Sequence, residues 1–100
     1  HVEETPLPYC DFKRDGRTAV IVKKIDSSVV ERLHSLIPEN SINLVDKDNL
    51  RLNSEKLNLM TIQDAKGLEF ETVYVIDEGM SDNEKYVAYT RALNRLIVIE

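Results

Sequence analysis

The sequence is poor in the residues that build cross-links, tight turns and phosphate loops. Its 100 residues include one cysteine, three glycines, three prolines and no tryptophan. A single cysteine excludes an internal disulfide framework and a multi-cysteine zinc site, and it favours a reducing, cytoplasmic location. The three glycines (Gly16, Gly67 and Gly79) are too far apart for the phosphate loop GxxxxGK[ST] or the dinucleotide fingerprint GxGxxG. The chain therefore has no triphosphate-binding loop of its own.

Long apolar runs and an excess of basic charge are also missing. No stretch approaches the about 20 apolar residues that span a bilayer, and no signal-peptide pattern opens the chain, so we expect no membrane contact. Lys and Arg number 13 against 18 Asp and Glu, for a net charge of −5. A free-standing nucleic-acid binder usually has a basic face. Any nucleic-acid contact should therefore use a few placed groups beside a more basic partner domain. Because the chain begins with His1 rather than Met, we expect it to be a fragment of a longer protein.

The composition, 42% hydrophobic and 31% charged, is that of one globular domain. Several short apolar runs lack the polar alternation of a one-sided sheet, which indicates strands buried on both faces of a parallel sheet. These runs are residues 19–22, 73–76 and 96–99. Two more strands are expected at residues 42–45 and 57–62. Residues 1–17 are polar and predict an irregular lead-in with room for one short edge strand.

Two capping boxes predict two helices. Ser28 and Glu31 open the first, which Pro38 should end. Ser81 and Glu84 open the second, which should run to about Ala92. The alternation of strands and helices predicts an α/β fold with a mostly parallel sheet. Two helices are too few to cover both faces of five strands, so neighbouring domains should cover part of the sheet.

The first candidate binding segment is residues 61–70, TIQDAKGLEF, which directly follows a strand. Its first residues after the strand, 63–67, predict a polar loop or a single helical turn. Ligands of open parallel sheets lie beyond the carboxyl ends of the strands. Gly67 permits close backbone approach, while Lys66 offers donors and Glu69 offers acceptors for sugar hydroxyls. The alternative is an ordinary connection between strands with solvated charges.

The second candidate segment, residues 86–96, runs from a helix into the last strand and is expected at the same carboxyl edge. It contains Arg91, whose planar guanidinium suits phosphate oxygens. The alternative is an arginine that binds carbonyl groups at the helix C-terminus or pairs with a carboxylate such as Asp77.

Taken together, residues 61–70 and residues 87–96 (VAYTRALNRL) resemble motifs V and VI of the superfamily 1 UvrD/Rep-type DNA helicases. The order of the motifs and the apolar strands between and after them are also similar. The resemblance covers residues 18–100. It implies a second, C-terminal RecA-like domain: a three-layer α/β fold, lacking its own P-loop, from an ATP-driven DNA helicase or translocase. The short connections before and between the motifs are closest to the DNA helicase IV/HelD-like group.

The resemblance also implies an ATP site shared between two domains. Arg91 resembles the motif VI arginine that reaches the γ-phosphate as an arginine finger. Glu69 resembles the carboxylate that holds the ribose, and Lys66 and Gly67 lie in the loop at the ATP cleft. The P-loop and the Mg²⁺ ligands are expected on a missing first RecA-like domain of the same chain. The fragment alone is therefore predicted to be inactive.

The resemblance further implies contact with single-stranded DNA. Thr61 and Gln63 resemble positions that touch the strand's backbone, although many relatives carry His where this chain has Gln63. Two alternatives stay open. One is a HelD-like motor whose partner is RNA polymerase, and the other is a non-catalytic α/β interaction domain.

Overall fold

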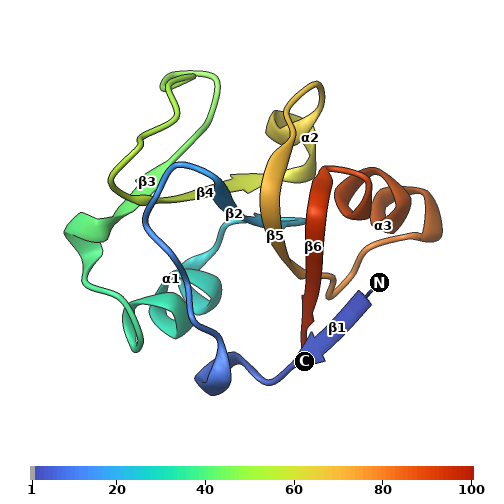
Figure 1. The fold of residues 1–100 in the computed structure, drawn as a ribbon, viewed down its shortest axis with the longest axis horizontal. Coiled ribbons are helices and arrows are strands. Elements are labelled where there is room, and N and C mark those ends of the chain that lie inside the picture. The colour runs from blue at the N-terminus through green and yellow to red at the C-terminus, as the bar shows by residue number, and fades with distance from the viewer. Residues whose placement is uncertain (1) are drawn as a thin grey trace.

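The computed structural model describes residues 2–100; His1, the first residue of the expected lead-in, lies outside the described residues. Across residues 2–100, six strands form one parallel sheet in the order β1-β6-β5-β2-β4-β3 (Figure 1). The expected α/β fold with a parallel sheet is confirmed. The strands are β1 Val2–Thr5, β2 Thr18–Val22, β3 Ile42–Leu44, β4 Leu57–Thr61, β5 Phe70–Ile76 and β6 Ala92–Ile99. The α-helices are α1 Ser27–His34, α2 Ile62–Ala65 and α3 Asp82–Tyr89, with 3₁₀ turns at η1 Leu7–Tyr9 and η2 Glu39–Ser41.

The strands differ from the sequence prediction mainly at their ends. β5 and β6 begin at Phe70 and Ala92, earlier than the apolar runs that predicted them. Their first halves carry exposed polar residues such as Glu71 and Arg95. An apolar run marks only the part of a strand that is buried on both faces. The short edge strand predicted within residues 1–17 is β1, which pairs with β6.

The helix starts follow their capping groups. At α3 the expected capping box is present: the Ser81 side chain accepts from the backbone N–H of Glu84, and the Glu84 carboxylate accepts from that of Ser81. The helix ends at Tyr89, because β6 already begins at Ala92. α2 is the single helical turn that the polar segment after β4 allowed.

The capping box expected at Ser28 is wrong. The N-cap of α1 is Asp26, whose carboxylate accepts a hydrogen bond of 3.0 Å from the backbone N–H of Val29. Asp and Ser are about equally good N-caps, so residue type alone could not tell Asp26 from Ser28 as the start of the helix. The backbone places Asp26 in the capping position and Ser28 inside the helix. α1 also ends earlier than expected, at His34, and the residues before Pro38 form a turn.

Each face of the sheet has its own apolar core. α1 lies over one face, and α2 and α3 lie over the other. The lead-in runs alongside α1 (Figure 1) and adds Phe12 to that core. The Phe12 and Tyr74 rings lie 4.6 Å apart, and the Tyr74 hydroxyl donates to the carbonyl of Asp11 at 2.9 Å. The lead-in thus supplies part of the cover that we expected from neighbouring domains.

A buried asparagine organises the connection between β3 and β4. The Asn58 side chain is fully buried and accepts from the Asn43 side chain at 2.8 Å and from the Asn53 backbone at 2.9 Å. It also donates to the Asn53 carbonyl at 3.1 Å. These bonds hold the polar loop of residues 45–56 against the sheet.

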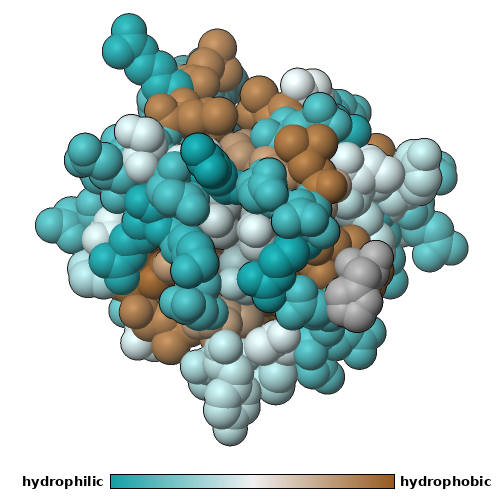
Figure 2. Space-filling model, in the orientation of Figure 1, coloured by the Kyte–Doolittle hydropathy of each residue, from teal (hydrophilic) through white to brown (hydrophobic). Residues whose placement is uncertain are grey.

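Figure 2 shows that the face viewed in Figure 1 is mostly hydrophilic, with scattered hydrophobic patches. No helix within residues 2–100 is long and apolar enough to cross a bilayer.

Candidate functional site

The predicted site residues are divided between the two edges of the sheet. Thr61 ends β4 at the carboxyl edge, and Gln63 follows in α2. Glu69 and Arg91 precede β5 and β6 at the amino edge. The expectation that the second segment lies at the carboxyl edge is therefore wrong. That segment connects the end of α3 to the start of β6, and α3 spans the sheet from the one edge to the other.

Arg91 is half-buried and binds the end of α3. Its Nε donates to the Val87 carbonyl at 3.2 Å, its Nη1 to the Leu68 carbonyl at 3.4 Å, and its Nη2 to the Thr90 hydroxyl at 3.2 Å. These contacts match the alternative interpretation of Arg91, in which the side chain binds carbonyl groups at the C-terminus of the helix. A guanidinium has five N–H donors, so two remain beyond these three hydrogen bonds. The side chain thus lies on the rim beside Glu69 with donors to spare.

Asp77 does not pair with Arg91. The Tyr89 hydroxyl donates to the Asp77 carboxylate at 2.8 Å. Burial and this carboxylate together raise the pKa of Tyr89 to about 12. The Asp77 carboxylate is therefore engaged by Tyr89.

Glu69 and Arg91 are brought together by backbone hydrogen bonds. The backbone N–H of Phe70 donates to the Arg91 carbonyl at 2.9 Å, and the Arg91 side chain binds the carbonyl of the residue before Glu69. Glu69 is exposed. Gly67 has a φ of +84°, and a Cβ added there would meet nothing within 4 Å. The turn needs glycine for its left-handed backbone, and the backbone there is open to approach.

A hollow of about 300 Å³ lies between α2 and α3. It brings together Gln63 and Lys66 from the first segment, whereas Glu69 and Arg91 are not among its lining residues. Thr61 does not line the hollow. Its hydroxyl caps α2 by donating to the Asp64 carboxylate at 3.0 Å and accepting from the Asp64 backbone at 3.4 Å. The full lining is Lys23, Ile62, Gln63, Lys66, Asn83, Glu84 and Val87.

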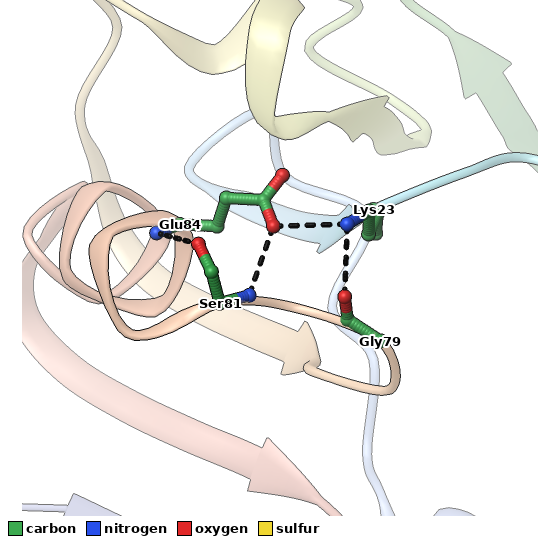
Figure 3. Close-up of polar contacts among 4 residues, drawn as sticks. All are labelled: Lys23, Gly79, Ser81 and Glu84. Atoms are coloured by element: carbon green, nitrogen blue, oxygen red, sulfur yellow. Dashed lines mark hydrogen bonds and ion pairs between the residues drawn. The ribbon is translucent and has the colours of Figure 1, made fainter.

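Sequence reasoning missed Lys23, the first residue after β2. Its ammonium donates to the Gly79 carbonyl at 2.9 Å and to the Glu84 carboxylate at 3.0 Å (Figure 3). The Ser81 backbone N–H and then Lys23 hold the pKa of Glu84 below its ordinary value of 4.5. Lys23 directly follows a fully apolar run, and this position beyond the carboxyl end of a parallel strand could have indicated a site residue from the sequence.

A second hollow of about 230 Å³ adjoins Lys23 at the carboxyl ends of β2 and β5. The connection after β2 leads to α1 on one face, and the connection after β5 leads to α3 on the other. Such a switch point opens a crevice outside the carboxyl ends of the strands, where open α/β sheets bind their ligands. The carboxyl edge thus offers a binding surface that neither Glu69 nor Arg91 lines.

Comparisons with known proteins identify the family. No curated protein sequence matches the chain. The crystal structure of the C-terminal domain of a possible DNA helicase from Lactobacillus plantarum WCFS1 is similar, with 25% sequence identity and a TM-score of 0.61 over 99% of this chain and 71% of that chain. This similarity says nothing about RNA polymerase as a partner or about membership of the HelD-like group, so both stay predictions. The family model described as the UvrD-like helicase C-terminal domain matches residues 17–100. The chain belongs to this family and forms the C-terminal part of a helicase motor.

Proposed function

We propose that this chain supplies half of an ATP site in a DNA helicase or translocase. The other half belongs to an N-terminal helicase domain that carries the P-loop and the Mg²⁺ ligands. The observation that supports this is the placement of Glu69 and Arg91 on one rim, at the starts of the neighbouring strands β5 and β6.

The side chains on this rim fit a nucleotide. Glu69 is exposed, so its carboxylate can accept hydrogen bonds from the two ribose hydroxyls. Arg91 keeps two N–H donors beyond its three hydrogen bonds and can turn them toward phosphate oxygens. Bound ATP supplies the phosphoryl group whose transfer drives the motor. An arginine that reaches that group lowers the activation barrier and so raises the rate of hydrolysis by about 10³- to 10⁵-fold.

The carboxyl edge provides the surface for single-stranded DNA. Gln63, Lys66 and Lys23 line the hollow there, and Thr61 leads into it from β4. A strand held through its phosphates by a few cations and amides is bound with little regard to sequence. Opening and closing of the cleft between the two domains then moves this surface along the strand.

The test compares ATP turnover by full-length Arg91→Ala and Arg91→Lys proteins. We expect turnover to fall by about 10³-fold or more in both, with ATP binding largely kept, because lysine lacks the guanidinium fork. Arg95→Ala is the matched control. It removes an arginine of β6 that pairs with Glu3 of the neighbouring edge strand β1. Full turnover in either Arg91 variant would reduce the residue to its structural role at the end of α3.

A further inference from the structure

Glu84 places a carboxylate in the wall of the hollow that we propose as part of the DNA surface. Its Oε1 accepts from the Lys23 ammonium at 3.0 Å and from the Ser81 backbone at 2.9 Å. The Lys23 and Glu84 side chains are 45% and 35% exposed, so the pair stands at the edge of the hollow in contact with solvent. Figure 3 shows Glu84 reaching from α3 across to Lys23 at the end of β2.

The charges in the hollow set up a competition. Lys23 and Lys66 are its cations, and Glu84 is the one acid among the described residues that line it. A carboxylate and a phosphodiester offer the same kind of charge-assisted acceptor to an ammonium group. Lys23 already gives two of its three donors to Gly79 and Glu84. A phosphate that approaches Lys23 therefore meets both an occupied cation and a like charge.

The helix cap does not need this charge. In a capping box the third helical residue is Glu or Gln, because either side chain accepts from the backbone of the capping residue. A glutamine at position 84 would keep the bond to Ser81 and lose the ion pair with Lys23. The negative charge of Glu84 thus has a separate effect, which acts on Lys23 and on any anion in the hollow.

We infer that Glu84 is an internal competitor for Lys23 that weakens the hold of the hollow on the backbone of single-stranded DNA. The inference rests on the proposed DNA surface and adds a residue that opposes binding. A motor must release its strand at every step, and a carboxylate that rebinds Lys23 as the phosphate leaves favours that release.

The test measures binding of fluorescein-labelled oligo-dT to the full-length protein at low salt by fluorescence anisotropy. We expect Glu84→Gln to bind about fivefold more tightly or better, the effect of removing one like charge at about 4 Å in a water-like medium. Glu71→Gln is the matched control. It makes the same charge change on an exposed residue near the amino end of β5, and screening should limit its gain to about twofold.

A second background separates competition for Lys23 from a general charge effect. In Lys23→Met protein the gain from Glu84→Gln should fall to that of Glu71→Gln, since the cation for which Glu84 competes is gone. Equal gains from the two Gln variants, or a gain that persists without Lys23, would overturn the inference. Thermal melting of each variant confirms that the fold is kept.

The same assay distinguishes failure of the inference from failure of the DNA surface. Gln63→Ala and Lys66→Ala should each weaken oligo-dT binding if the hollow is part of that surface. If they do so while Glu84→Gln has no specific effect, only the competitor is rejected. If neither changes binding, the DNA surface itself is wrong, and the inference falls with it.

Discussion

Asn58 combines complete burial with hydrogen bonds to two other segments of the chain. Asn58→Ala removes these bonds and leaves the half-buried backbone N–H and carbonyl of Asn53 without these partners, while the Asn43 amide keeps its bond to the Arg51 carbonyl. We expect the free energy of unfolding to fall by about 2–3 kcal/mol, as measured by urea denaturation. Asn49→Ala is the control, because that exposed amide can be replaced by water and its loss should cost about 1 kcal/mol or less. Equal losses would mean that Asn58 does not organise the loop.

Tyr89 should titrate above its usual range. Its pKa is raised from 10.0 to about 12, because burial and the Asp77 carboxylate disfavour the phenolate. The folded protein therefore holds this proton more tightly than the unfolded chain. The contribution to stability is complete below pH 10 and is lost as the pH rises toward 12. Tyr89→Phe should remove the last step of the tyrosinate absorbance titration, and Tyr9→Phe should leave it in place.

Single residues of the site were predictable from sequence to different degrees. Glu69 and Arg91 came from motif resemblance, and the structure places them together, while their roles stay predictions. Lys23 was not found, because its partners Gly79 and Glu84 lie far along the chain. A lysine after an apolar run has many ordinary explanations until the fold shows what it faces.

At the scale of elements, the start of α1 offers a direct test of the corrected cap. Asp26→Ala should lower the free energy of unfolding by about 1 kcal/mol, because the backbone N–H of Val29 loses its acceptor. Ser28→Ala should change it by only a few tenths of a kcal/mol, since Ser28 already lies inside the helix. Thermal or urea unfolding of the two variants makes the comparison. A larger loss from Ser28→Ala would restore the original prediction.

The elements themselves were largely predictable, and their ends were not. The apolar runs located the doubly buried parts of β2, β5 and β6, because two-sided burial requires apolar residues at successive positions. The exposed first half of β6 carries Asn94 and Arg95, and nothing local distinguishes it from a loop. Strand order was out of reach as well, because it depends on which strands pack together across the whole chain.

At the scale of the whole molecule, the chain lacks a phosphate loop. We therefore expect no ATP hydrolysis by the purified 100-residue chain in a phosphate-release assay, with the full-length protein measured beside it. Its three glycines are too dispersed to wrap a triphosphate. Robust turnover by the chain alone would show that the division of the site between two domains is wrong.

The pairing of β1 with β6 has a consequence for synthesis on the ribosome. Val2 lies beside Leu96, and the backbone of Glu100 donates to Thr5, so the first strand of this domain is bound by its last. Until β6 has emerged, β1 has no partner, and one side of β5 lies bare. The sheet of this domain is therefore completed only after β6 has left the ribosome. The nascent chain meanwhile exposes apolar strands of the kind that chaperones recognise.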